Sequence, residues 1–369
     1  MLRILIFGHL GQGNIGDELM FQPIVAALRQ RFPEARLTVS AGRLYDRSFC
    51  EANQIRRIPR TFRRLLSSLL QHDMLVIAGG THLHTCRTTS RYTKGVLRHL
   101  VIYRLARLAG LKVWLVGVGI GPFETRIGRI LGRAAARAAH FISARDEDSL
   151  AWLRRFAVPR DRLRMCRDPA YHLSLPSPRR SSPHLGISAM GYFGLYHRTP
   201  DRDEILARRF HDVIRNWFRV FPNSRVSLVA FYSSDDQESD ALLARRIQAE
   251  WPGDSRVCVI DPRGSVDRCV ECFRHFTHVI AMRYHSQVLA SLYGVPHVVI
   301  AYHGKNRSLA ADSGAWLEDI IAVEDFAGGG GQAAIERLFR RSVVMPPIPS
   351  HVVGDELLPV HGSSEHESS

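Results

Sequence analysis

Short apolar runs alternate with longer amphipathic stretches along most of this chain, and this alternation constrains the fold more than any other feature. In the first half, the expected strands are 3–7, 36–40, 74–78, 112–118 and 141–144, and the expected helices are 18–31, 91–108, 126–139 and 146–156. Strands that alternate with helices in this way form parallel sheets covered by helices on both faces. The pattern therefore predicts an α/β fold.

A segment rich in Pro, Ser and Arg, 174–183, interrupts the alternation, which then restarts. The expected strands of the second half are 184–190, 225–231, 256–260, 278–282 and 297–301, and the expected helices are 203–218, 240–250, 266–273 and 286–294. At about 150 residues per domain, a chain of this length holds two domains. We therefore expect two doubly wound, Rossmann-like domains, 1–173 and 184–343, that face each other across a cleft. Residues 344–369, rich in Pro, Ser, His and Glu, are expected to form a disordered tail.

Several classes of protein are disfavoured by the sequence. The opening apolar run, 1–7, is too short for a signal peptide and reads as a buried strand. No run reaches the roughly 18 uninterrupted apolar residues of a membrane-spanning helix. The six cysteines are scattered, and the Cys269–Cys272 pair on an expected helix indicates neither a disulfide framework nor a zinc site. We expect a cytoplasmic protein.

The net charge of +15 would attract nucleic acid, anionic lipid or a phosphorylated substrate, and charge alone does not choose among them. Basic clusters fall on expected helices at Arg56–Arg57, Arg63–Arg64, Arg98 with Arg104 and Arg107, and Arg126 with Arg129, Arg133 and Arg137. Their spacing places many of the cations on one face, which could lie against an acidic membrane surface or could be solvated. A nucleic-acid site would also need interleaved aromatic residues, which the stretch 126–137 lacks.

The tripeptide Arg283-Tyr284-His285 lies between an apolar run and an expected helix. A strand that ends in a cation, one spacer and an imidazole directs a fixed charge and a proton donor toward one crevice, as an anionic substrate requires. The simpler alternative is a surface arginine followed by a histidine that caps the helix. Glycine-rich and charged segments elsewhere favour the first interpretation.

Three glycine-rich segments follow expected strands of the first half: 8–18, 78–82 and 117–122. Glycines permit tight turns, and backbone amides at the start of a helix can hold an anion or a hydroxyl. The first segment is not a nucleotide P-loop, because no Lys-Ser/Thr pair follows, and it could instead be a tight turn with Asp17 as a helix cap. Three such turns at one sheet edge predict a shared cleft. Its candidate binding residues are Gly13, Asn14, Gly16, Asp17, Gly80, Thr81, His82 and Gly119.

Charged residues follow three more expected strands or turns. Arg145 precedes Asp146, Glu147 and Asp148, and could simply pair with those carboxylates. Asp168 could be a general base or a turn former before Pro169. Asp235, in Ser233-Ser234-Asp235-Asp236, follows a strand and so points toward the predicted crevice.

Together these segments resemble the polysaccharide pyruvyl transferase family. The similarity rests on Gly13-Asn14-Ile15-Gly16-Asp17-Glu18, Gly79-Gly80, Gly117-Val118-Gly119-Ile120-Gly121-Pro122, Ala144-Arg145-Asp146-Glu147-Asp148-Ser149, Asp168-Pro169-Ala170, and Met282-Arg283-Tyr284-His285 with Gly294-Val295-Pro296, in family order. The resemblance implies a fold like that of GT-B glycosyltransferases. It also implies phosphoenolpyruvate as donor and, as acceptor, a sugar of a cell-envelope or exopolysaccharide precursor, with lipid-linked sugars among the candidates.

Resemblance and chemistry together nominate roles for the site residues. Arg145 and Arg283 would clamp the carboxylate and phosphate of phosphoenolpyruvate with their bidentate forks. His285 would be the general acid, because imidazole titrates near neutral pH. Asp17 and Asn14 suit acceptor hydroxyls, and no metal or nucleotide cofactor is required.

Departures from the family pattern concern the acceptor more than the donor. Ala78 and the run Thr81 to His84 replace a third glycine and an apolar pair, and Tyr284 is commonly aliphatic in relatives. Some relatives place a histidine near the Gly-Ile-Gly-Pro turn, for which His82 or His84 could substitute.

Two other functions are weighed. A nucleotide-sugar-dependent GT-B glycosyltransferase would share the architecture and the Arg-x-His position, but no acidic pair for a ribose is visible. A non-catalytic protein that binds nucleic acid or membrane would rest on the charge alone. We expect no nucleic-acid partner, and we keep peripheral association with the inner membrane surface open.

Overall fold

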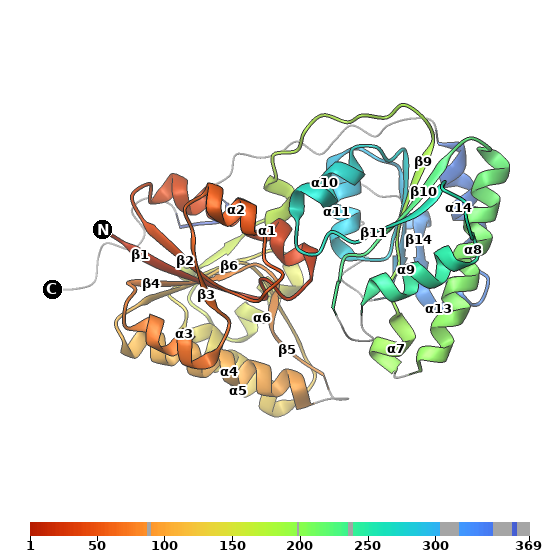
Figure 1. Cartoon of the computed structure of the whole chain (residues 1–369). Helices are drawn as coiled ribbons and strands as arrows, with labels where there is room; N and C mark the ends of the chain where they lie inside the picture. The colour runs from red at the N-terminus through yellow and green to blue at the C-terminus, as the bar shows by residue number, and fades with distance from the viewer. Residues whose placement is uncertain (87–89, 198, 235–238, 303–316, 342–355, 360–369) are drawn as a thin grey trace. The chain divides into compact units, whose positions relative to one another are not determined.

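The computed structural model describes residues 1–86, 90–197, 199–234, 239–302, 317–341 and 356–359 (Figure 1). The chain divides into two compact units. Unit 1 comprises Met1–Gln12, Asp17–Leu173 and His351–Ser369, and unit 2 comprises Gly13–Gly16 and Ser174–Ser350. None of the described helices is both long enough and apolar enough to span a bilayer.

The sheet of unit 1 is parallel throughout and has the strand order β3-β2-β1-β4-β6-β7-β8, with β5 paired to β6. Its strands are β1 (Arg3–Phe7), β2 (Arg36–Ala41), β3 (Arg56–Pro59), β4 (Met74–Ala78), β5 (Thr81–Thr85), β6 (Lys112–Phe123), β7 (Phe141–Ala144) and β8 (Leu163–Met165). The order reverses between β1 and β4, as in a doubly wound sheet.

Helices cover both faces of this sheet (Figure 1). They are α1 (Ile15–Arg31), α2 (Arg47–Ala52), α3 (Phe62–Leu69), α4 (Ser90–Leu108), α5 (Arg126–Ala138) and α6 (Glu147–Arg155). Residues alternate across the pleat of each strand, so Leu5 and Phe7 pack with α3 to α6, whereas Ile4 and Ile6 pack with α1. Each face of the sheet therefore has its own hydrophobic core.

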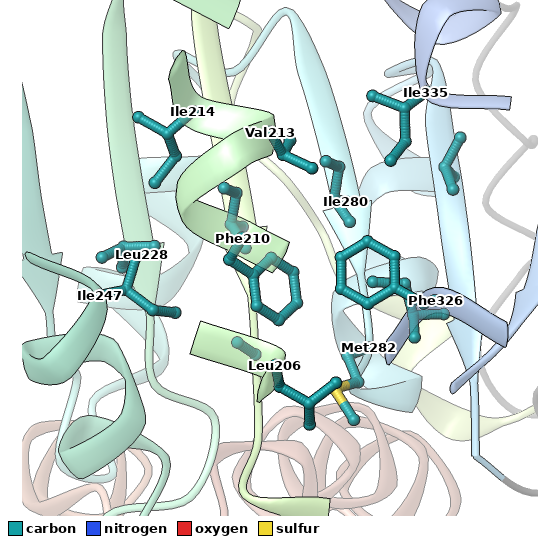
Figure 2. Close-up of a cluster of buried hydrophobic side chains, with 14 of the residues drawn as sticks. Leu206, Phe210, Val213, Ile214, Leu228, Ile247, Ile280, Met282, Phe326 and Ile335 are labelled. Atoms are coloured by element: carbon teal, nitrogen blue, oxygen red, sulfur yellow. The ribbon is translucent and has the colours of Figure 1, made fainter. Parts of the chain in front are cut away.

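Unit 2 repeats the design with the order β11-β10-β9-β12-β13-β14, again all parallel. Its strands are β9 (His184–Ser188), β10 (Arg225–Val229), β11 (Val257–Ile260), β12 (His278–Ala281), β13 (His297–Ala301) and β14 (Ile320–Ala322). Its helices are α7 (Tyr192–His197), α8 (Asp203–Val220), α9 (Asp240–Ala249), α10 (Val266–Phe273), α11 (Tyr284–Leu292), α13 (Val323–Ala327) and α14 (Gln332–Arg340). Figure 2 shows the core in which Leu206 and Phe210 of α8 meet Ile280, Met282 and Phe326.

The predicted fold class, two doubly wound α/β domains, is confirmed for each unit, but short elements were missed. Arg56 and Arg57 lie on the edge strand β3 and not on a helix. An edge strand tolerates charge because one side faces water, and Arg57 donates to the backbone oxygens of Ala41 and Gly42. The predicted turn at 117–122 is instead part of β6, which continues to Phe123 because β5 pairs with it.

The expectation of a disordered tail is wrong for the described residues 356–359. Leu357 and Leu358 are 0% and 2% exposed, within the same core as Ile4 and Ile6. The backbone oxygen of Leu358 accepts a 2.9 Å hydrogen bond from Arg164 Nη1. This short apolar pair packs into the core of unit 1. The polar composition of the residues around it had predicted disorder instead.

We expect Leu357→Ala to destabilise unit 1, because it removes a fully buried side chain and leaves a cavity. A large-to-small change of this kind costs about 2–5 kcal/mol. The free energy of unfolding, measured by urea titration, should fall accordingly. Leu108→Ala is the matched control, since Leu108 is 84% exposed; equal effects of the two substitutions would contradict the burial of Leu357.

Candidate functional site

The carboxyl ends of parallel strands meet at one edge of each sheet, and the candidate residues follow strands at these edges. In unit 1, β1 is followed by Gly8, β4 by Gly79 and β7 by Arg145. In unit 2, Arg283 follows β12 after one residue. The two groups are built differently.

Arg145 forms a buried ion pair with Asp168. Its Nη1 lies 2.8 Å from Asp168 Oδ2, and the side chains are 7% and 1% exposed. Arg145 Nη2 also donates to Thr81 Oγ1 at 3.1 Å, whereas Asp146 Oδ2 is 3.8 Å from Nε. Asp168 Oδ1 accepts from the backbone N–H of Ala170. Removing one partner of such a pair leaves an uncompensated buried charge, at a cost of about 3–5 kcal/mol.

Two glycines of β6 make room for this pair. A Cβ on Gly119 would lie 2.7 Å from Thr81 Oγ1 and 3.2 Å from Arg145 Nε. A Cβ on Gly117 would lie 2.1 Å from the ring of Pro169, the neighbour of Asp168. The structure thus brings Arg145, Thr81, Gly119 and Asp168 together, as the sequence predicted for one edge of a sheet.

Two further candidate residues, Asp17 and His82, lie next to Gly80. Gly80 has a φ of +72°, a conformation that favours glycine. A Cβ at this position would lie 3.2 Å from Asp17 Oδ1 and 3.4 Å from His82 Nε2. Asp17, a first-turn residue of α1 and not its cap, therefore shares a corner of unit 1 with Gly80 and His82.

His82 belongs to a buried histidine cluster that also contains His9 and His99. The His82 ring stacks on His9 at 4.7 Å and meets His99 edge-on at 5.1 Å between centroids. Tyr103 Oη lies 3.3 Å from His99 Nδ1. Sequence reasoning missed His99, because a lone histidine on a helix carries no motif, and passed over His9 although it lies in the first glycine-rich segment.

Burial keeps these imidazoles neutral. Desolvation lowers the pKa of His82 to about 4, and it lowers the pKa of His9 and His99 well below the ordinary value. The guanidinium groups of Arg60 and Arg98 act in the same direction on His9 and His99. Loss of the proton is therefore favoured by both the low dielectric and the nearby positive charge.

The same cluster is the metal-capable group among the described residues, with one ring nitrogen from each histidine within 4.8 Å of the others. A tetrahedral zinc ion with Zn–N bonds of about 2.0–2.1 Å needs ligand atoms roughly 3.3 Å apart. The three imidazole rings would therefore have to move closer together to bind it. Arg60 and Arg98 would also repel a cation. The expectation that the reaction needs no metal stays a prediction.

In unit 2, Arg283 is held by a bidentate ion pair with Asp240. Its Nε lies 2.9 Å from Asp240 Oδ2 and its Nη2 lies 2.5 Å from Oδ1. Asp240 is fully buried and also accepts from the backbone N–H groups of Phe231 and Tyr232. Burial raises the pKa of Asp240, whereas Arg283 and the two N–H groups oppose that rise. Sequence reasoning placed Asp240 at a helix start without giving it this role.

His285 lies in the first turn of α11 and is 9% exposed. A Cβ on Gly16 would come 2.1 Å from His285 Nδ1, so only glycine leaves space for this imidazole. The Tyr284 ring lies edge-on to His285, at 5.1 Å between centroids. The fixed imidazole and Arg283 are thus neighbours at one sheet edge, as predicted from their spacing.

The segment Gly13–Gly16 is tied to unit 2 by backbone hydrogen bonds. Ser233 donates to the Gly13 oxygen at 2.9 Å, and Ile15 donates to the Phe231 oxygen at 2.9 Å. Asn14 Oδ1 accepts from the Gly16 N–H at 3.2 Å. The candidates Gly13, Asn14 and Gly16 are therefore grouped with His285, whereas the candidate Asp235 lies outside the described residues.

Comparison with known proteins assigns a family. A model of the polysaccharide pyruvyl transferase family matches residues 14–304. No curated protein matches the chain. Similar solved structures include the UDP-GlcNAc 2-epimerase of Methanocaldococcus jannaschii, with a TM-score of 0.61 and 12% identity over 94% of this chain and 95% of that one. The UDP-GlcNAc 2-epimerase of Neisseria meningitidis, bound to UDP-GlcNAc, has a TM-score of 0.57 and 12% identity, again over 94% and 95% of the two chains. At these identities the likeness concerns the fold.

We expect the histidine cluster to make the protein sensitive to mild acid. The folded-state pKa of each of the three imidazoles is below its unfolded value near 6.5, so the unfolded state binds more protons as the pH falls. Their contribution to stability is complete above pH 6.5 and is lost as the pH falls toward 4, by up to about 1.4 kcal/mol per pH unit for each group.

Urea titrations at several pH values between 5 and 7 measure this effect. His99→Gln should give a shallower dependence of the unfolding free energy on pH, by about one bound proton. His275→Gln is the matched control, because His275 of unit 2 is only partly buried, with 41% of its side chain exposed. Parallel pH profiles for His99→Gln and the unaltered protein would show that the cluster does not control acid stability.

Proposed function

The chain belongs to the polysaccharide pyruvyl transferase family, and on this premise we propose that it transfers the enolpyruvyl group of phosphoenolpyruvate to a sugar of a glycan precursor. The product is a pyruvate ketal, and phosphate is released. The observation that carries the proposal is the fixed pair of Arg283 and His285 at the carboxyl edge of unit 2, with the imidazole held against Gly16.

Ketal formation requires a proton, two hydroxyls and a leaving phosphate. A proton is added to the methylene carbon of phosphoenolpyruvate, which leaves positive charge on the adjacent carbon. One sugar hydroxyl adds there and gives up its proton, phosphate leaves, and the second hydroxyl adds and gives up its proton. His285 supplies the first proton in this scheme, since a protonated imidazole is a proton donor. The ring packs closely against Gly16, and general acid catalysis benefits from a donor held in place.

Arg145 and Arg283 recognise the two anionic groups of the donor in this proposal. The Nε–Nη2 edge of Arg283 binds Asp240, which holds the guanidinium in one orientation. Arg145 donates hydrogen bonds from Nη1 to Asp168 and from Nη2 to Thr81. In this proposal it attracts the substrate anion by its positive charge, and its partners hold the guanidinium in place. Asp168 then positions Arg145 and is not assigned the role of a base.

The acceptor is proposed to meet residues of the first glycine-rich segment and the β4–β5 turn. Asp17, Asn14 and His82 offer oxygen and nitrogen atoms suited to sugar hydroxyls. A sugar of a cell-envelope or exopolysaccharide precursor, free or lipid-linked, fits the family. Phosphoenolpyruvate is a cytoplasmic metabolite, which supports a cytoplasmic site of action.

The function is tested by phosphate release from phosphoenolpyruvate against a panel of glycan and lipid-linked sugar acceptors. We expect phosphate release that depends on one class of acceptor, with gain of a pyruvate ketal detected by mass spectrometry. Nucleotide sugars form a parallel donor set. Transfer from a nucleotide sugar without any use of phosphoenolpyruvate would favour the alternative, a nucleotide-sugar-dependent GT-B glycosyltransferase.

His285→Ala should lower kcat by about 10²–10⁴-fold, the usual contribution of a general acid. Phosphoenolpyruvate affinity, measured by calorimetry, should change little, because the arginines carry the electrostatic attraction. Equal losses of turnover and affinity would make His285 a binding residue.

Gly16→Ala separates position from chemistry. It keeps the imidazole but forces it to move, since the new Cβ cannot lie 2.1 Å from Nδ1. We expect kcat to fall, and we expect overpacking to cost about 1–3 kcal/mol of stability, so turnover is measured at a temperature at which circular dichroism shows the variant folded. Gly95→Ala is the matched control, because a Cβ there meets no atom within 4 Å. Full activity of Gly16→Ala would contradict the positioning of His285.

A further inference from the structure

Three helices of unit 1 carry positive charge and no acidic residue of their own. The helices α3, α4 and α5 lie together on the same side of the sheet (Figure 1). Their sequences contain no Asp or Glu. All of their Lys and Arg residues are exposed: Arg63, Arg64, Arg91, Lys94, Arg98, Arg104, Arg107, Arg126, Arg129, Arg133 and Arg137. We call the exposed residues of these three helices the α3–α5 face.

Large apolar side chains are exposed on the same face. Of the thirteen exposed large hydrophobic residues in the described part of the chain, eight lie on or directly beside these helices. They are Phe62, Leu70, Tyr92, Leu97, Val101, Leu108, Ile127 and Ile130. Four of them are more than 60% exposed: Leu108 at 84%, Leu70 at 80%, Ile127 at 65% and Ile130 at 62%. Such concentration distinguishes the face from the scattered apolar residues normal on protein surfaces.

The apolar and basic residues of α4 form one stripe. Leu97, Val101, Arg104 and Leu108 are spaced by four, three and four residues, so they share the outward side of the helix. The inward side carries Val96, Ile102 and other buried residues. On α5, Ile130, Arg133 and Arg137 repeat the spacing, with Ile127 beside them. Helices α4 and α5 pack against each other.

A simply solvated helix of the same protein looks different. Helix α8 of unit 2 carries Asp203, Glu204 and Asp212 among Arg208, Arg209, Arg215 and Arg219, and several of these form ion pairs. Mixed signs of this kind are usual on water-facing helices. Helix α6, which follows α5 on the same side of the sheet, again carries both Glu147 and Arg154. Unlike α6 and α8, the helices α3, α4 and α5 carry cations and no acidic residue.

We propose that the α3–α5 face docks the protein on an anionic lipid bilayer. The leucine, isoleucine and phenylalanine side chains enter the boundary between headgroups and acyl chains, and the arginines bind lipid phosphates while their stems cover apolar surface. Nucleic acid would engage the cations but would leave the aliphatic side chains in water. A bilayer with acidic headgroups is the partner that satisfies both kinds of residue.

The proposal does not rest on the enzymatic function, although a protein at a membrane surface would meet lipid-linked sugars there. Each lysine or arginine near an anionic surface raises affinity about fivefold. Removing two arginines from the face should therefore weaken binding about 25-fold. Removal of exposed apolar residues should also weaken binding, and this loss of affinity should not depend on salt concentration, because salt screens only charges.

The test uses the full chain with sedimented or floated vesicles. We expect binding to vesicles of phosphatidylcholine with phosphatidylglycerol, and little binding to phosphatidylcholine alone. Arg129→Ala/Arg133→Ala should lower the affinity for the anionic vesicles about 25-fold. Arg208→Ala/Arg215→Ala on α8 removes the same charge elsewhere and should change it little. All four side chains are exposed, and circular dichroism checks that each variant is folded.

A second pair of variants separates insertion from simple attraction. Ile127→Ser/Ile130→Ser should reduce binding at every salt concentration. Absence of binding to anionic vesicles, or an equal loss in the α8 control, overturns the proposal. Full binding by the Ile127→Ser/Ile130→Ser protein overturns insertion of the apolar residues and leaves an acidic macromolecule as the better partner.

Discussion

A buried arginine–aspartate pair at the carboxyl edge of the sheet is the interaction on which each unit's candidate residues depend. Arg145 pairs with Asp168 in unit 1, and Arg283 pairs with Asp240 in unit 2. Both aspartates are almost completely buried and are held by backbone N–H groups. The guanidinium orientation is therefore set by the protein itself, and a group with a pre-set orientation costs less to order on binding.

The glycines near these pairs allow neighbouring side chains to approach the backbone closely. The sequence suggested backbone cradles at three glycine-rich segments. In the structure, Gly16 leaves room for His285, and Gly119 leaves room for Arg145 and Thr81. A single added methyl group at either position would displace a side chain whose chemistry is proposed to matter. Glycine-rich segments can therefore have a second physical role besides anion binding: the missing Cβ leaves space for a neighbouring functional side chain.

The sequence predicted what local patterns determine. Strand and helix alternation identified most buried strands, and the position of Arg283-Tyr284-His285 after an apolar run correctly indicated a sheet edge. Partners distant in the chain were not predicted, because Asp240 and His99 carry no motif and acquire their surroundings only through tertiary packing. The short edge strand β3 and the buried Leu357 were also not predicted. Each has only one or two apolar residues among polar neighbours, so the local sequence shows no apolar run.

The net charge of +15 has a different physical origin from the charges of the candidate site. Arg145 and Arg283 are each matched by a buried carboxylate, so the electrostatics of these positions is local and contributes little to the field of the whole protein. The exposed cations of α3, α4 and α5 have no acidic residue on their own helices. These three helices therefore contribute a large part of the excess positive charge, and their exposed cations act at longer range than the two paired arginines.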